Sequence, residues 1–127
     1  MFSTIAAIAA GGAVGAVLRH GVNIAAFKLF GDGFPWGTLT VNILGSFIMG
    51  ALIVLFAHIW QPSQTVKVFL ITGLLGAFTT FSTFSLDVST LWERGDMLAT
   101  AGYVIGSVVL SVGALFLAMA LVRNLVS

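Results

Sequence analysis

The stretch GAFTTFSTFS, residues 76–85, places three phenylalanines three residues apart and fills most of the gaps between them with hydroxyl side chains. A phenyl ring is electropositive at its edge, so the rings of Phe81 and Phe84 could stabilise an anion without a full charge that would trap it. The neighbouring hydroxyl groups could donate hydrogen bonds to the same ion. Plain packing of the phenylalanines is the alternative, and spacing alone favours it, because Phe78 shows that the spacing is not selective.

The same stretch is expected to interrupt a helix. Gly73 and Gly76 precede the cluster of threonines and serines, and both glycine and β-branched threonine weaken a helix. Hydroxyl groups also offer the backbone alternative hydrogen-bond partners. These features predict a break around Gly76–Thr80, which at membrane depth must be buried in protein or line a cavity. Carbonyl groups freed there would need a donor, water or a small hard cation, above all where two copies of the chain converge.

Further polar side chains lie at helical spacing in otherwise apolar segments. Thr38 and Asn42 are four residues apart, and Tyr103, Ser107 and Ser111 follow one another at the same interval. A single serine in a helix can bond the carbonyl four residues before it, whereas three hydroxyls in register favour a polar track. An asparagine amide needs several partners, so Asn42 is expected to face the interior, as a pathway donor or as a clamp between helices.

The composition places these residues in a bilayer. Of the 127 residues, 59% are hydrophobic and only 7% are charged, whereas soluble domains carry about 25% charged residues. Uncharged runs of roughly 20 residues predict membrane-spanning helices, because backbone groups in lipid must be paired within the segment. We therefore predict an all-α integral membrane protein, a single domain over residues 1–127, with a break in the third of four transmembrane helices near 3–29, 36–60, 66–92 and 97–123.

Several function classes are disfavoured by what the chain contains. A net charge of +1 without clustered lysine or arginine argues against nucleic acid. The chain has no cysteine and two isolated histidines, which argues against a side-chain metal cluster. No nucleophile and base are evidently paired, so we do not expect an enzyme. A cation or proton pathway would want an acid at mid-membrane, but the acids fall at or near predicted helix ends: Asp32, Asp87, Glu93 and Asp96.

The positive charges of the loops do not choose an orientation. Lys67 and Arg123 fall on the side of the two termini, and Lys28 and Arg94 fall on the opposite side. The positive-inside rule then gives no bias. This tie predicts dual topology, in which the chain inserts both ways and assembles as an antiparallel homodimer. A fixed topology set by subtler features is the alternative.

Glycine spacing indicates close helix packing. Gly11 and Gly15 form a GxxxG pair with Arg19 four residues further on, and Gly102 and Gly106 repeat the pattern in the last span. Small residues let helix backbones approach in a membrane, so the face that carries Arg19 is expected to contact protein. Arg19 itself either extends to the membrane interface, attracts an anion at a vestibule, or pairs with carbonyls at a helix end.

Three motifs together resemble a known family. GAFTTFSTFS with Phe81 and Phe84, GTLTVNILGS with Asn42, and GAVLR ending in Arg19 look like those of the Fluc/CrcB fluoride channels, a membrane protein family also named for camphor resistance. The resemblance covers essentially the whole chain in size and number of spans, and TTFSTFS after a glycine-rich turn is its most specific part. It implies passive fluoride export through two pores of an antiparallel homodimer in the cell membrane, the inner membrane if the source is Gram-negative.

The resemblance also implies roles for individual residues. Arg19 would stand near the vestibule, and backbone carbonyls of Gly76 and Thr79 would hold a structural sodium ion (Na+) at the dimer axis. Ala77 stands where the family often has glycine, and we expect sodium to survive because carbonyl ligation ignores side chains. Leu115 stands where another donor is sometimes found, which leaves the exit end of the track open. The fluoride pathway would comprise Asn42, Phe81, Phe84 and Ser111, with Thr38, Tyr103 and Ser107 beside them.

Two other function classes stay open from the residues alone. A dual-topology exporter of small organic cations fits the size and the charge tie, but it needs a membrane-embedded carboxylate that trades protons for substrate. A non-conducting membrane assembly subunit would need no pathway, so loss of Asn42 or Ser111 would affect only its stability. For the fluoride channel, the expected partners are the fluoride ion, a second copy of the chain and membrane lipid.

Overall fold

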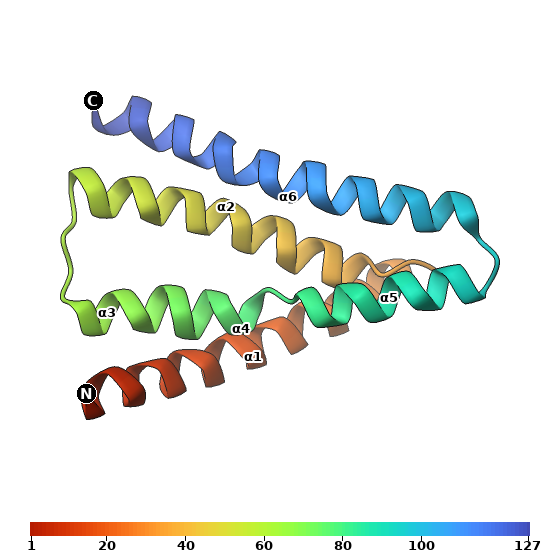
Figure 1. The fold of residues 1–127 in the computed structure, drawn as a ribbon, viewed down its shortest axis with the longest axis horizontal. Coiled ribbons are helices and arrows are strands. Elements are labelled where there is room, and N and C mark those ends of the chain that lie inside the picture. Colours follow the sequence, from red (N-terminus) through yellow and green to blue (C-terminus); the bar gives the residue numbers. More distant parts are fainter.

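The computed structural model describes residues 1–127 and consists of helices joined by short connections (Figure 1). Residues 64–93 form one interrupted span, in which η1 is a π-helix. With the other three helices this makes four spans long and apolar enough to cross a membrane, so the predicted all-α, multi-pass architecture is confirmed. The elements are α1 (Phe2–Phe30), α2 (Trp36–His58), α3 (Gln64–Val68), η1 (Phe69–Leu75), α4 (Gly76–Phe78), α5 (Phe81–Glu93) and α6 (Met97–Val126).

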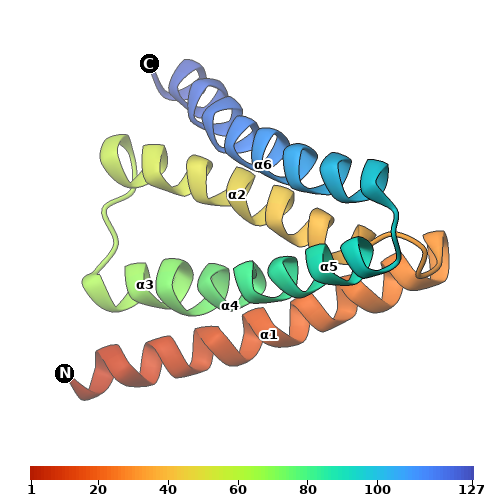
Figure 2. The same cartoon turned by 45° about the vertical axis from the view of Figure 1, so that its right-hand side comes forward.

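The four spans form two pairs of parallel neighbours. Both termini and the connection from α2 to α3 lie at one end of the molecule, and the other two connections lie at the opposite end (Figure 1). As a result, α2 and α6 run side by side in the same direction, while α1 runs along the interrupted span formed by α3, η1, α4 and α5. The turned view in Figure 2 shows the same pairing. The predicted placement of loop charges at the two ends therefore holds.

Helix bounds agree with the predicted spans within three residues at every end. The exception to a simple pattern is η1, whose wider π-helical turns over Phe69–Leu75 were not predicted. Such turns are rare and tend to occur at functional sites. Here they lie directly before the interruption of the third span.

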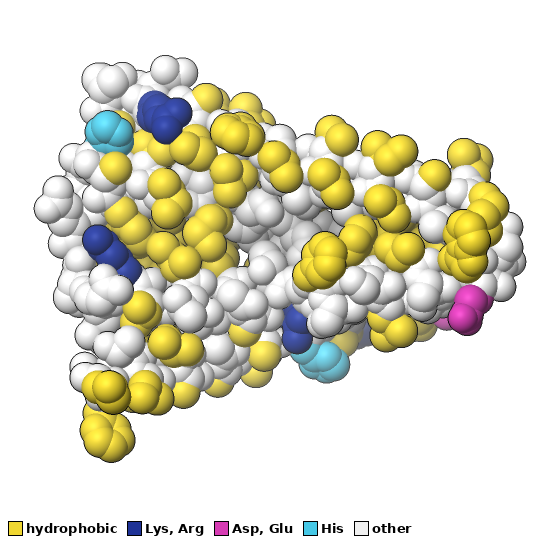
Figure 3. Space-filling model, in the orientation of Figure 1, with side chains coloured by type: hydrophobic (Ala, Val, Ile, Leu, Met, Phe, Trp, Pro, Cys, Tyr) yellow, Lys and Arg dark blue, Asp and Glu magenta, His cyan; other side chains and the backbone are white.

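Apolar side chains cover the surface of the molecule. Only 18 of 127 residues are buried within the chain, and hydrophobic side chains dominate the face drawn in Figure 3, with few charges among them. In water this surface would be far larger than the apolar patches that monomeric proteins expose. It fits a helix bundle whose outer faces meet lipid or another protein. The fully buried side chains are Tyr103, Leu75, Val41 and Val54.

Glycines bring the backbones of α1 and η1 into direct contact. A Cβ atom on Gly11 would collide with the carbonyl oxygen of Phe69, and one on Gly15 would collide with that of Leu74. From the other side, a Cβ atom on Gly73 would lie 2.7 Å from the backbone oxygen of Ile8. The backbones therefore touch directly, and the predicted packing of the first GxxxG pair is confirmed.

The glycines of α6 behave differently from those of α1. A Cβ atom on Gly102, Gly106 or Gly113 would meet nothing within 4 Å. These glycines thus lie on a face of α6 that has no neighbour in the single chain. The close packing predicted for them is not made within one copy.

Candidate functional site

The third span is broken at Thr79 and Thr80, inside the predicted interval. Both residues have extended backbone angles, with φ −85° and ψ 160° at Thr79 and φ −154° and ψ 123° at Thr80. The Thr79 hydroxyl donates to the carbonyl of Leu75 at 2.9 Å and so closes the end of α4. The Thr80 hydroxyl accepts from the Thr83 amide at 3.2 Å and caps the start of α5, as N-terminal threonines commonly do. The predicted break is confirmed.

Asn42 on α2 holds this break in place. Its Oδ1 accepts from the Thr80 amide at 2.8 Å, and its Nδ2 donates to the Thr80 carbonyl at 3.1 Å. The two groups of an extended residue point to the same side, so one primary amide can bind both at once. The interpretation of Asn42 as a clamp between helices is therefore confirmed. One hydrogen on Nδ2 is left for another acceptor, because the amide group carries two.

The break frees backbone carbonyls on the third span. In a continuous helix the Thr80 amide would bond the Gly76 carbonyl, but here it bonds Asn42. Likewise the Thr83 amide bonds the Thr80 hydroxyl instead of the Thr79 carbonyl. Gly76 and Thr79 thus each keep a carbonyl without its usual helical partner. Gly76 is exposed on the single chain.

A cavity of about 350 Å³ lies between α2, the break and α6. No charged side chain lines it. Its polar wall is formed by an amide and hydroxyls, and its apolar wall includes the two phenylalanines that begin α5. The predicted residues that the structure brings together here are Asn42, Phe81, Phe84, Ser107 and Ser111, with Gly76 and Thr79 at the break.

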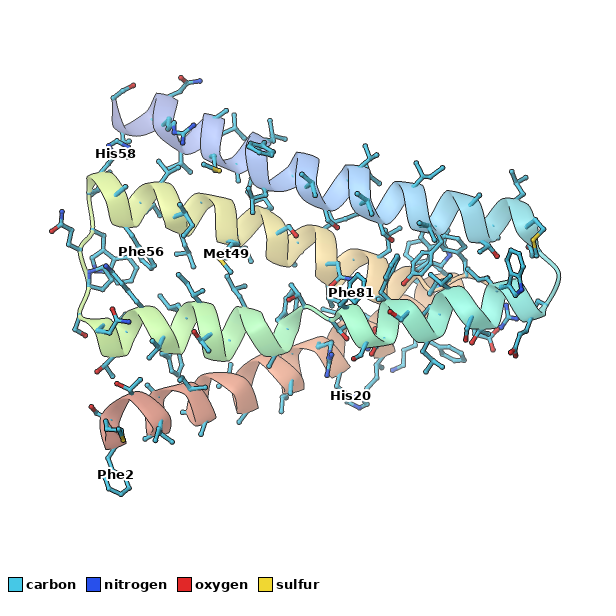
Figure 4. All side chains as sticks on the ribbon, in the orientation of Figure 1. Phe2, His20, Met49, Phe56, His58 and Phe81 are labelled. Carbon is cyan, nitrogen blue, oxygen red and sulfur yellow. The ribbon has the colours of Figure 1, made fainter.

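The three phenylalanines of the motif have different surroundings. Phe78 is 5% exposed and packs over Gly45 of α2, which makes it a packing residue. Phe81 and Phe84 line the cavity, with ring centroids 5.5 Å apart. Phe81 is 78% exposed at the start of α5 (Figure 4), so it lies at the open rim of the cavity. Spacing alone could not separate these environments.

Ser107 and Ser111 present hydroxyls that nothing in the chain satisfies. Both oxygen atoms are buried without a hydrogen-bond partner. By contrast, the hydroxyls of Ser85, Thr90 and Thr100 donate to carbonyls four residues before them, at 3.1, 3.0 and 2.7 Å. The alternative that the two α6 serines bond their own helix is therefore wrong. Buried unpaired hydroxyls carry a free-energy cost, which an acceptor in the cavity would relieve.

Tyr103 and Thr38 lie beyond this cavity, toward the end of the bundle that carries the α1–α2 and α5–α6 connections. Tyr103 is fully buried, and its hydroxyl donates to Oδ2 of Asp87 at 2.9 Å. Its ring packs against Phe84 and Phe34, with centroids 5.1 and 5.4 Å away. Thr38 and Asp87 line a second cavity of about 310 Å³. The predicted polar track therefore has members at both cavities, while Tyr103 lines neither.

Asp87 was missed as a partner of the predicted track. Sequence placed it near a helix end, but it lies within α5, well before Glu93, and is half-buried against Tyr103. At the same end Arg94 donates to the carbonyl of Gly33 at 3.1 Å and joins two connections. A contact between Asp87 and Tyr103 depends on how α5 and α6 are rotated, which spacing does not reveal.

Arg19 is not part of either cavity in the single chain. It is half-buried on α1 and lines neither space. Its vestibule role stays a prediction. The structure has no group of three or more clustered acidic, histidine or cysteine side chains. Backbone oxygens at the break are the groups that could hold a cation.

Comparison with known proteins fits this arrangement. The family model described as "CrcB-like protein, Camphor Resistance (CrcB)" matches residues 6–119. The chain belongs to the CrcB family. CrcB relatives named "Fluoride-specific ion channel FluC" include one from Rhodospirillum centenum, 51% identical over 123 residues, which are 97% of this chain and 98% of the relative.

Two further CrcB relatives with the same name are as similar to this chain. The Agrobacterium fabrum protein is 50% identical over 121 residues, covering 95% of this chain and 97% of its own length. The Paracoccus denitrificans protein is 50% identical over 125 residues, covering 98% of each chain. The CrcB match over residues 6–119 thus includes all of the residues that line the cavity.

Proposed function

We propose that this CrcB protein is a fluoride-selective ion channel that exports fluoride passively and protects the cell from it. Full-length relatives named as fluoride-specific channels support this function. The observation that carries it is a cavity between helices apolar enough to span a membrane, which two phenyl rings and no charged side chain line, and in which the hydroxyls of Ser107 and Ser111 are buried without a partner. Such a lining suits a small anion that must exchange its water shell for neutral donors.

Each group in the cavity has a defined part in this proposal. The hydroxyls of Ser107 and Ser111 donate to the ion, and the edges of Phe81 and Phe84 add weaker electrostatic support. Asn42 offers its one remaining Nδ2 hydrogen. Its Oδ1, which would repel an anion, is already occupied by the Thr80 amide. The absence of a fixed positive charge lets the ion leave as easily as it enters.

The proposed assembly is an antiparallel homodimer with two pores. Several exposed features of one chain support a partner on the face of the break: Phe81 is 78% exposed, and Gly76 is open. On α6, Gly102, Gly106 and Gly113 form a strip where another backbone could approach closely. The charge tie between the two ends suits insertion in both orientations.

Orientation can be tested by adding charge to one end. Gln61→Arg with Gln64→Arg should fix one topology, and Asp32→Arg with Glu93→Arg should fix the other, because positive charge is retained on the cytoplasmic side. Each double variant alone should fail to protect fluoride-sensitive cells, and co-expression of both should restore protection. Full protection by either double variant alone would reject the antiparallel dimer.

A structural sodium ion fits the break. The carbonyls of Gly76 and Thr79 lack their helical partners, and hard cations prefer oxygen ligands. Ala77 does not interfere, since the ligands are backbone atoms. When bound, sodium would offset the charge of carbonyls converging from two copies. Replacing sodium with N-methylglucamine should lower the thermal midpoint of the detergent-solubilised protein by several degrees, and an unchanged midpoint would count against the ion.

Reconstituted efflux tests the channel itself. Liposomes containing the protein should release fluoride rapidly and chloride hardly at all, as followed with ion-selective electrodes. Phe81→Ile and Phe84→Ile should cut fluoride efflux, whereas Phe2→Ile should not, because Phe2 is 90% exposed at the start of α1 and does not line the cavity. Comparable chloride efflux would reject fluoride selectivity. Resistance to quaternary ammonium dyes in place of fluoride would favour the exporter of organic cations.

A further inference from the structure

The parallel pair α2 and α6 is in register along the cavity. A Cβ atom on Gly50 would collide with the carbonyl oxygen of Leu115, so these residues lie at the same level. Both helices run in the same direction (Figure 1) and rise by about 1.5 Å per residue. Steps of four residues toward their N-termini therefore stay level, and they pair Ser46 with Ser111, Asn42 with Ser107, and Thr38 with Tyr103.

Ser46 is the member of this ladder that sequence reasoning passed over. It lines the cavity together with Asn42, Ser107 and Ser111. No hydrogen bond in the structure uses its hydroxyl. Thr40 on the same helix shows the usual alternative, since its hydroxyl donates to the Trp36 carbonyl at 2.7 Å. The Ser46 hydroxyl is therefore free to serve the cavity.

Ser111, which is level with Ser46, is the last residue of the α6 polar track that carries a hydroxyl. One turn beyond Ser111 stands Leu115, and this residue and Met49 of α2 (labelled in Figure 4) both line the cavity as apolar residues. If α2 were apolar at this level, an ion beside Ser111 would meet a hydroxyl from α6 alone. Ser46 supplies a second hydroxyl from the neighbouring helix α2.

We propose that Ser46 is a fluoride-binding residue of the pathway and forms, with Ser111, its last donor pair before the apolar end. The inference rests on the proposed channel function and deepens it. It places a donor on α2 level with Ser111, one turn before the apolar Leu115 of α6. Fluoride passing this level would accept hydrogen bonds from two helices instead of one.

The experiment compares two side chains of the same shape. Ser46→Thr keeps the hydroxyl and Ser46→Val replaces it with a methyl group, so both are β-branched and differ in one donor. In reconstituted liposomes, Ser46→Thr should keep fluoride efflux within about twofold of wild type, and Ser46→Val should lower it about fivefold, the effect of one lost hydrogen bond. Ser46→Val should also raise the fluoride concentration that gives half-maximal efflux.

Controls separate this inference from the function it depends on. Thr40→Ala removes a hydroxyl of α2 that is bonded to its own helix, and it should leave efflux unchanged. Equal efflux from Ser46→Val and Ser46→Thr would overturn the role of Ser46 while leaving the channel intact. Wild-type liposomes that release no fluoride would instead reject the proposed function, and the role of Ser46 with it.

Discussion

The two parallel helix pairs use small residues for opposite purposes. Where α1 meets η1, Gly11, Gly15 and Gly73 bring the backbones into direct contact and leave no space between them. Where α2 meets α6, direct contact is made at Gly50, and the wall next to it opens into a cavity of about 350 Å³. The first pair is a sealed contact, and the second is one wall of a polar space.

This difference separates stability from function within one bundle. The contact of α1 with η1 leaves no room for a side chain, so its variants should change folding and leave ion selectivity alone. The cavity has room but depends on its donors, so its variants should change transport with little effect on folding. The number of small residues in a helix does not distinguish the contact from the cavity. What distinguishes them is whether the small residues are glycines in backbone contact or serines with a free hydroxyl.

The largest effect is expected at Asn42, which both stabilises the break and offers a donor to the ion. Asn42→Ala removes both hydrogen bonds to Thr80, which is 8% exposed. Leaving the amide and carbonyl unpaired should destabilise the fold by about 2–4 kcal/mol. Fluoride efflux should fall more than about 100-fold, because both the break and a donor are lost. Thermal unfolding in detergent and liposome efflux measure the two effects.

Asn42→Asp is the matched control for that variant. It keeps an acceptor for the Thr80 amide but loses the donor to the Thr80 carbonyl and adds a negative charge to the cavity. Unfolding should shift less than with Asn42→Ala, while fluoride efflux should fall as far. An Asn42→Ala protein with an unchanged unfolding midpoint would show that the break does not depend on this clamp.

The sealed contact is tested by two alanine substitutions on one helix. Gly15→Ala introduces a Cβ atom that collides with the Leu74 carbonyl oxygen, whereas at Gly21 nothing lies within 4 Å. Overpacking of this kind should cost Gly15→Ala about 1–3 kcal/mol, while Gly21→Ala should be neutral or stabilising by up to about 1 kcal/mol. Detergent unfolding followed by circular dichroism measures both. Chloride-to-fluoride selectivity should be the same in whatever folded protein remains, and a changed selectivity would break the comparison.

The serines of the cavity should show the opposite pattern. Ser107→Ala and Ser111→Ala each remove a buried hydroxyl that has no partner. Stability should stay the same or rise by up to about 1 kcal/mol, because an unsatisfied polar group is lost. Fluoride efflux should nevertheless fall about five- to tenfold for each variant. A loss of stability with unchanged efflux would place these serines in the packing of the bundle instead of the ion pathway.

Much of the fold could be predicted from the sequence because membrane spans leave a strong signal. Long uncharged runs gave the four helices, and the cluster of glycine and hydroxyl residues gave the break at Thr79 and Thr80. The packing of Gly11 and Gly15 followed from their spacing. These predictions rest on local chemistry, since backbone groups in lipid must be satisfied within the segment.

The parts of the site that could not be predicted depend on rotation and register between helices. Their spacing does not distinguish Phe78, Phe81 and Phe84. In the structure, however, Phe78 is buried against Gly45, while Phe81 lies at the rim of the cavity. The bond between Tyr103 and Asp87 likewise joins helices whose relative rotation no local pattern fixes. The position of Ser46 level with Ser111 depends on the register of α2 against α6, which the contact between Gly50 and Leu115 fixes.

The smallest effect is expected at Tyr103, where the cavity around the break gives way to the space near the loops. Tyr103→Phe keeps the ring between Phe34 and Phe84 and removes only the hydrogen bond to Asp87. The loss should be about 1 kcal/mol in stability and less than about threefold in fluoride efflux, because the hydroxyl is already given to Asp87 and does not line the cavity. A loss of efflux as large as that of Ser107→Ala would show that this hydroxyl turns from Asp87 to the passing ion, and the polar ladder would then extend one level further toward the loops.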